Sequence, residues 1–239
     1  PAAPLDNWHW RTLTPPGPGI SFEGAAYYND SYLVIGWNGT IMISPDGITW
    51  TSRTSGILND LWEVACGGGS LVAVGDCGDL TTSPDGITWT ARTSGTTDVL
   101  QAVAFGANTF VAVGWNGLVM TSPDGSSWTG RTSGTTNSLY GLTYADGKFV
   151  AVGHSGAILT SADGANWSSQ TSGTTERLQG VAYGGGKFVA VGENGVILTS
   201  PDGTSWTVRS GVGFITGTTQ TLLGVAYGGG SFVAAGVNG

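Results

Sequence analysis

The sequence repeats itself every 39 residues, and this period restricts the fold more than any other feature. The motif Ser-x-Asp-Gly-x-x-Trp starts at Ser44 and recurs four times at the same interval. A block of small and β-branched residues precedes each motif and occurs once more near the end of the chain. Such a period is typical of one supersecondary unit that buries its apolar face by stacking on its neighbours. The motifs span residues 44–50, 83–89, 122–128, 161–167 and 200–206, and the blocks span 25–36, 64–75, 103–114, 142–153, 181–192 and 225–236.

Each unit predicts four short strands. In the fifth unit they fall at residues 180–183, 188–191, 196–199 and 206–209, separated by turns rich in Gly and Asn. Four strands in about 40 residues is the size of one β-propeller blade. The consecutive apolar residues at 188–191 indicate a strand that neighbouring blades cover on both faces.

The length of the chain predicts six blades. Six units of 39 residues and one insertion of five, between Arg209 and Leu222, account for all 239 residues. Near the N-terminus, Asp6 and Trp10 keep the Asp-to-Trp interval of the motif. We therefore expect one all-β domain, residues 1–239: a six-bladed propeller with four-stranded antiparallel blades. Its last blade would combine C-terminal inner strands with an outer strand from residues 8–12. The third strand of this blade would have to come from residues 1–5, which contain two prolines, and prolines are poor members of a β-ladder. A truncated seven-bladed ring therefore stays an alternative.

Composition excludes several classes of partner. Ten tryptophans and 40 % hydrophobic residues indicate a folded chain. A net charge of −8 argues against nucleic acid and anionic membranes, which require a basic face. No apolar stretch reaches the length of about 18 residues that a membrane span needs. The low charge and the Ser/Thr-rich surface favour an extracellular, cell-surface or periplasmic location.

The cysteines and histidines predict neither a disulfide nor a metal or cofactor site. Cys66 and Cys77 fall at opposite ends of a predicted strand, roughly 20 Å apart at about 3.3 Å per residue, which is too far for a disulfide. We expect two free thiols. His9 and His154 are distant in sequence, and the cysteines lack the spacing of zinc ligands.

The repeated motifs resemble those of known propellers. The Ser-Pro-Asp-Gly-x-x-Trp hairpins are similar to the Asp-boxes of sialidases and other bacterial neuraminidase repeat proteins. The unit Gly-Val-Ala-Tyr, Phe-Val-Ala-Val-Gly-x-Asn-Gly and Asp-box resembles the repeats of the photosystem II assembly factor family of Ycf48 and HCF136. The resemblance covers nearly the whole chain, and it implies that the Asp-box turns lie on the face away from the ligand site.

The residues of these turns also have a structural explanation. The Asp side chain is suited to accept hydrogen bonds from N–H groups of its own turn, Gly adopts a φ that other residues resist, and Trp packs between sheets. We interpret the following carboxylates as structural: Asp46, Asp85, Asp124, Asp163 and Asp202.

The repeats differ most at two positions. Between the second and third strands, one residue precedes an Asn-Gly pair, which is Cys-Gly in the second unit and Ser-Gly in the fourth. This residue is in turn Trp37, Asp76, Trp115, His154, Glu193 and Val237. The residue that enters the first strand is Glu23, Trp62, Gln101, Tyr140, Gln179 and Leu223. Both positions fall on one face of a propeller, around the mouth of its central channel. The predicted ligand-binding residues are Trp37, Asp76, Trp115, His154, Glu193, Trp62 and Tyr140.

Aromatic side chains among carboxylates and amides are suited to stack on a sugar ring and hydrogen-bond with it. We therefore expect a non-enzymatic, lectin-like module that binds glycans. A protein-binding scaffold or assembly factor of the Ycf48 type is the alternative, with Phe214 and Ile215 in the insertion as a candidate partner contact. A sialidase-like glycoside hydrolase is a second alternative, because a carboxylate pair could come from Glu23, Glu63, Asp76, Asp79 and Glu193. We expect the arginines to lie on outer strands, away from the mouth, so that the arginine grip of a sialidase is missing.

Overall fold

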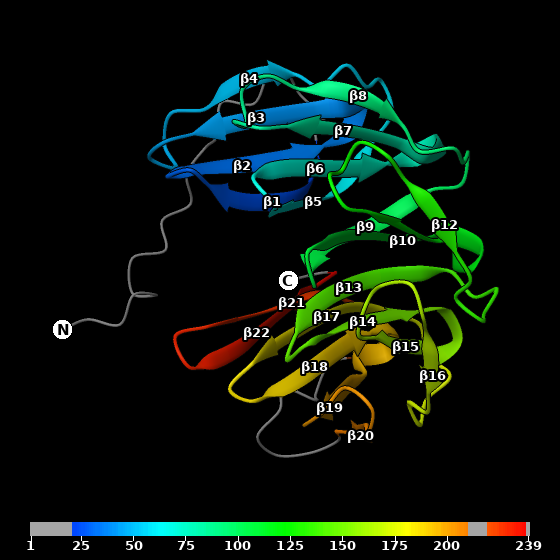
Figure 1. The fold of residues 1–239 in the computed structure, drawn as a ribbon. Coiled ribbons are helices and arrows are strands. Elements are labelled where there is room, and N and C mark those ends of the chain that lie inside the picture. Colours follow the sequence, from blue (N-terminus) through cyan, green and yellow to red (C-terminus); the bar gives the residue numbers. More distant parts are fainter. Residues whose placement is uncertain (1–20, 210–218, 238–239) are drawn as a thin grey trace.

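The computed structural model describes residues 21–209 and 219–237, and every sheet in this part of the chain is antiparallel. Figure 1 shows the sheets following one another in sequence order, from β1–β4 in blue to β21–β22 in red. Five sheets have four strands each, and the sixth has two described strands, β21 and β22. This architecture confirms the predicted all-β propeller. The proposed outer strand at residues 8–12, the residues Trp8 and His9, and the tip Phe214–Ile215 lie outside the described residues.

The strands follow the 39-residue period. The first blade contains β1 (Phe22–Tyr28), β2 (Ser31–Gly36), β3 (Thr40–Ser44) and β4 (Thr51–Thr54), and the second contains β5 (Leu61–Gly67), β6 (Ser70–Gly75), β7 (Asp79–Ser83) and β8 (Thr90–Thr93). The third contains β9 (Leu100–Gly106), β10 (Thr109–Gly114), β11 (Val119–Ser122) and β12 (Thr129–Arg131), and the fourth β13 (Leu139–Ala145), β14 (Lys148–Gly153), β15 (Ile158–Ser161) and β16 (Ser168–Gln170). The fifth contains β17 (Leu178–Gly184), β18 (Lys187–Gly192), β19 (Ile197–Ser200) and β20 (Thr207–Val208), and the sixth β21 (Leu222–Gly228) and β22 (Ser231–Gly236).

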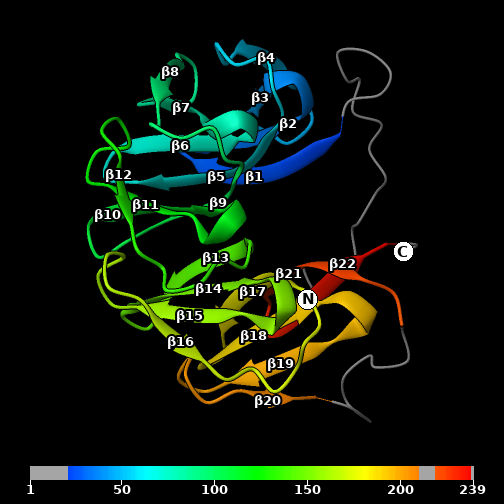
Figure 2. The same cartoon turned by 90° about the vertical axis from the view of Figure 1, so that its right-hand side faces the viewer.

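The hydrophobic core lies between the blades. The first strands of successive blades pack side by side in the order β1, β5, β9, β13, β17 and β21, as Figure 2 shows. Phe110, Phe149 and Phe188 occupy the same position in three second strands and are fully buried. Burying one such side chain contributes about 2–3 kcal/mol. Five such interfaces join the six blades in the described part of the chain, so the fold is stabilised by repetition of one packing arrangement.

The Ser-x-Asp-Gly-x-x-Trp turns make the hydrogen bonds predicted for them. In the fifth blade, an Asp202 Oδ1 accepts from the backbone N–H groups of Thr204 and Ser205, both at 2.8 Å. The Trp206 Nε1 donates to the Gly203 carbonyl at 2.8 Å. These hydrogen bonds to the charged form hold the pKa of Asp202 below its usual value. Since the carboxylate is used within its own turn, its structural role is confirmed.

The prediction of two free thiols is confirmed. Cys66 and Cys77 are both free and exposed. In the described part of the chain, no helix has the length and apolar character to cross a membrane.

Candidate functional site at the mouth of the central cavity

A β-bulge marks the start of the first strand in every blade. The register shift in β5 lies between Leu61 and Glu63, so Trp62 is the extra residue, and the same shift recurs in the other five blades. A bulge bends the strand and re-aims a side chain. The bulged residues are Glu23, Trp62, Gln101, Tyr140, Gln179 and Leu223, which is the variable strand-entry position of the sequence.

A repeated backbone hydrogen bond fixes the second variable position beside the first. The N–H of Asp76 donates to the carbonyl of Asp60, the residue before β5, at 2.9 Å. Equivalent bonds fix the other five residues: Trp37, Trp115, His154, Glu193 and Val237. A Cβ on Gly75 would lie 2.1 Å from the Asp60 carbonyl oxygen, so only glycine permits this approach. The predicted proximity of the two variable positions is therefore confirmed by the backbone.

Two neighbouring blades join these positions by an indole–carboxylate hydrogen bond. The Trp62 Nε1 donates to an Asp76 carboxylate oxygen at 2.6 Å. In the first blade the order is reversed, and the Trp37 Nε1 donates to Glu23 at 2.8 Å. A hydrogen bond to an ionised acceptor is stronger than one between neutral groups. Each indole is thus held in a defined orientation at the mouth.

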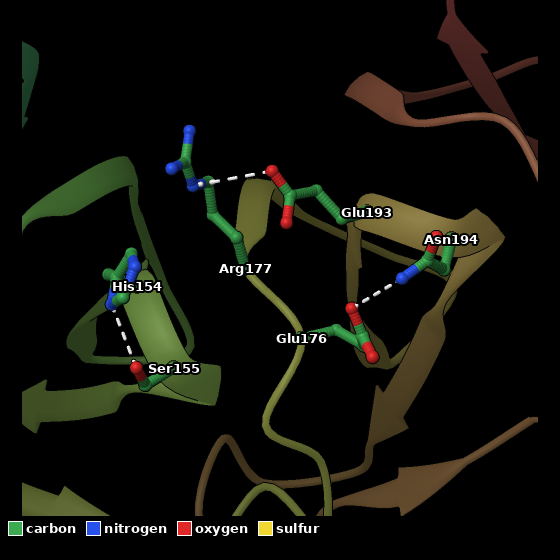
Figure 3. Close-up of polar contacts among 6 residues, drawn as sticks. All are labelled: His154, Ser155, Glu176, Arg177, Glu193 and Asn194. Atoms are coloured by element: carbon green, nitrogen blue, oxygen red, sulfur yellow. Dashed lines mark hydrogen bonds and ion pairs between the residues drawn. The ribbon is translucent and has the colours of Figure 1, made fainter.

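Arg177 connects the fourth and fifth blades. Its Nε lies 3.4 Å from Glu193 Oε1, and its guanidinium carbon lies 5.1 Å from the centre of the Tyr140 ring. Figure 3 shows Arg177 directed toward Glu193, and also the hydrogen bond from Asn194 to Glu176. The expectation that the arginines lie on outer strands is therefore wrong for Arg177. The residue before the first strand also varies between units, and a comparison of the repeats at that position would identify Arg177 from the sequence.

The remaining two predicted residues stand apart. His154 is exposed, and its Nδ1 lies 2.8 Å from the hydroxyl of its neighbour Ser155 (Figure 3). Trp115 is 48 % exposed. Both lie on the mouth by their backbone position, and neither lines the central cavity described next.

All six first strands line one central cavity of about 390 Å³. Its polar and aromatic lining comprises Glu23, Trp62, Glu63, Gln101, Tyr140 and Gln179. Of the seven predicted site residues, Trp62 and Tyr140 line it directly, whereas Trp37, Asp76 and Glu193 contact its lining residues or Arg177. The sequence suggests Glu63 only as a possible catalytic carboxylate, yet among the groups that line this cavity it has the most strongly shifted pKa. Burial raises its pKa to about 7, although the N–H of Val64 donates to it.

Larger recesses lie outside this cavity, but they lack its combination of aromatic, amide and carboxylate side chains. Three shallow recesses, of about 730, 720 and 590 Å³, are lined mainly by Ser, Thr and Gly from the loops that leave the fourth strands. The central cavity is the stronger candidate, because aromatic, amide and carboxylate side chains converge in it. Among the described residues, no group of three or more His, Cys, Asp or Glu is placed to hold a metal ion.

Comparisons with known proteins agree on the fold. Residues 101–213 match the family described as DUF6242 beta propeller domain. No curated protein matches the sequence. Among solved structures, the chain is similar to YCF48 bound to D1 peptide, with 18 % identity, a TM-score of 0.70, and coverage of 91 % of this chain and 74 % of that one.

Two other structures show a similar likeness. YCF48 from Cyanidioschyzon merolae has 15 % identity, a TM-score of 0.67, and coverage of 89 % and 78 %. The computationally designed Ika8 protein has 13 % identity, a TM-score of 0.70, and coverage of 90 % and 68 %. At these identities the likeness concerns the fold. The chain is a β-propeller with a structured cavity mouth on one face.

Proposed function

We propose that this chain is a protein-binding module that holds a peptide segment of a partner over the mouth of the central cavity. The observation that carries the proposal is the fixed arrangement of large side chains there: Trp62 on Asp76, Trp37 on Glu23, and Arg177 between Glu193 and Tyr140. Aromatic and Arg side chains held in place before binding are typical anchors of protein interfaces, because little entropy is lost when they are covered.

The comparisons support a peptide ligand over the glycan that the sequence first suggested. One structure of the same fold is YCF48 bound to D1 peptide. In addition, the indole N–H groups of Trp37 and Trp62 are already used within the protein. They are not free to hydrogen-bond sugar hydroxyls, which weakens the case for glycan binding at these two tryptophans. We propose binding without catalysis, and the extracellular, cell-surface or periplasmic location stays a prediction.

The test is selection of binders from a random dodecapeptide library on the immobilised chain, with a glycan array in parallel. Variants can be taken from sister blades, which favours folding: Trp62→Gln and Tyr140→Gln introduce the residue found at Gln101 and Gln179. The matched control is Ile87→Ser on the opposite face, where the next blade has Ser126.

We expect selected peptides whose affinity falls at least tenfold in both mouth variants and is unchanged in the control. Glycan binding that the mouth variants abolish, with no peptide selected, would overturn the proposal and restore the lectin hypothesis. Peptides that bind the mouth variants and the parent equally would also overturn it.

A further inference from the structure

Glu63 occupies a position where every other blade has almost no side chain. The equivalent residues of the other first strands, each directly after the bulge, are Gly24, Ala102, Gly141, Gly180 and Gly224. Space here is limited because the strands converge. A Cβ on Gly24 would lie 3.1 Å from the Glu63 Cα, and one on Gly141 would lie 2.9 Å from the Gln179 carbonyl oxygen. One blade in six thus places a carboxylate in the lining of the cavity at this position.

No cation among the described residues compensates this carboxylate. Arg177 pairs with Glu193. Lys148 and Lys187 begin second strands at the opposite face, where the Lys148 Nζ donates to the Asp202 carbonyl. The other described arginines belong to the fourth strands or follow them, and three donate to threonines one strand inward: Arg92, Arg131 and Arg209.

The surroundings of Glu63 increase the negative potential. Glu23 lines the same cavity, and six further carboxylates lie in the loops and turns at the mouth or, for Asp79, at the start of β7: Asp60, Asp76, Asp79, Asp98, Glu176 and Glu193. A carboxylate in a confined site without a counter-ion is destabilised by desolvation, and burial raises the pKa of Glu63 accordingly. A ligand cation would remove this penalty, whereas an anion would increase it.

We propose that the central cavity accepts one basic side chain, a lysine or an arginine, of the bound peptide, with Glu63 as its counter-ion. This inference rests on the proposed function. The Trp62 and Tyr140 rings in the lining are suited to contact the aliphatic part or the charge of that side chain, since cations are attracted to aromatic faces. The cavity of about 390 Å³ has room for one such side chain. The amides of Gln101 and Gln179 add acceptors for its N–H groups.

The test uses four short peptides that differ in one residue: acetyl-Gly-Ser-X-Ser-Gly-amide with X as lysine, arginine, norleucine or glutamine. Binding to the ¹⁵N-labelled chain is followed by the indole N–H signal of Trp62, which is assigned from its loss in Trp62→Phe. The lysine or arginine peptide should shift this signal, and the neutral peptides should not.

Two variants test the role of Glu63. Glu63→Gly introduces the residue of four sister blades, and Glu63→Gln keeps the size of the side chain. Both should reduce affinity for the basic peptide at least tenfold, whereas Asp146→Asn, in the turn between β13 and β14 on the opposite face, should not change it. As pH falls below about 7, affinity in the parent should decrease, because Glu63 of the unbound chain becomes protonated.

Equal binding of the lysine, arginine and norleucine peptides, an absence of binding by all four, or an unchanged preference in Glu63→Gly would overturn the inference. The proposed function fails separately. If the dodecapeptide library gives mouth-dependent binders that lack a basic residue, the module binds peptides and only the role of Glu63 is wrong. If the library gives none, the proposed function itself is wrong.

Discussion

The Trp62 indole donates a hydrogen bond to Asp76 at 2.6 Å, across 14 positions of the chain. The preceding blade makes the same contact with the residues exchanged, since Glu23 on the first strand accepts from Trp37 in the turn. In both blades the bulge and the backbone hydrogen bond to the turn bring these positions together. The Trp62 side chain is half-buried, so its indole N–H without an acceptor would be costly, whereas the Trp37 side chain is exposed.

The first prediction is that Trp62 and Asp76 are energetically coupled. In a double-mutant cycle with Trp62→Phe and Asp76→Asn, the interaction energy should be about 1 kcal/mol in urea denaturation. The exchanged double variant, Trp62→Glu with Asp76→Trp, should be more stable than either of its single variants, because it recreates the pair of the first blade. Strict additivity of the single variants would show that the contact contributes nothing.

The second prediction concerns pH. Since the pKa of Glu63 is raised from 4.5 to about 7 in the folded chain, the unfolded chain releases this proton first as pH rises. Glu63 therefore lowers the free energy of unfolding progressively between about pH 4.5 and 7. Glu63→Gln should match the parent at pH 4 and be more stable by roughly 1–3 kcal/mol at pH 8. Urea titrations at both pH values check this. A variant that is equally stable or less stable at pH 8 contradicts it.

A third prediction uses the turn after β6. Cys77 has a left-handed φ of 56°, and Asn38, Asn116 and Asn194 have nearly the same φ in sister blades. Asn adopts this region more readily than other L-residues with a side chain. Cys77→Asn should raise the free energy of unfolding by about 0.5–1 kcal/mol, measurable as an increased melting temperature. Cys77→Ser removes the thiol without the conformational gain and serves as the control; an equal increase in both variants would exclude the backbone explanation.

The fourth prediction compares two glycines in neighbouring blades. A Cβ on Gly75 meets the Asp60 carbonyl oxygen, whereas a Cβ on Gly130 in β12 meets nothing within 4 Å. Gly75→Ala should destabilise the chain by about 2 kcal/mol or more, because the turn must move away from β5. Gly130→Ala should be neutral or stabilising by about 0.5 kcal/mol, as expected from Ala91 at the same position of the second blade. Chemical denaturation of both variants distinguishes the two outcomes.

Much of the candidate site could be predicted from the sequence, because equivalent positions of the six repeats can be compared within one chain. The two variable positions identified Trp62, Tyr140 and Asp76, and the structure places all three at the mouth. Arg177 lies at a third variable position, the residue before the first strand, which these two positions do not include. The sequence shows Glu63 where four sister blades have glycine, but not that this position lines the central cavity.

The sequence alone determined the blades, the strand order and the structural role of the Ser-x-Asp-Gly-x-x-Trp turns. These features depend on contacts within about 40 residues, and each 39-residue repeat carries the same sequence pattern for them. The tertiary structure decided which variable side chains meet. The pairing of Trp62 with Asp76 depends on a bulge, the Arg177–Glu193 ion pair on the path of a loop, and the raised pKa of Glu63 on the convergence of six strands. The desolvation of a carboxylate and the orientation of these side chains arise only when different blades enclose the same space. A sequence pattern within one repeat therefore does not predict them.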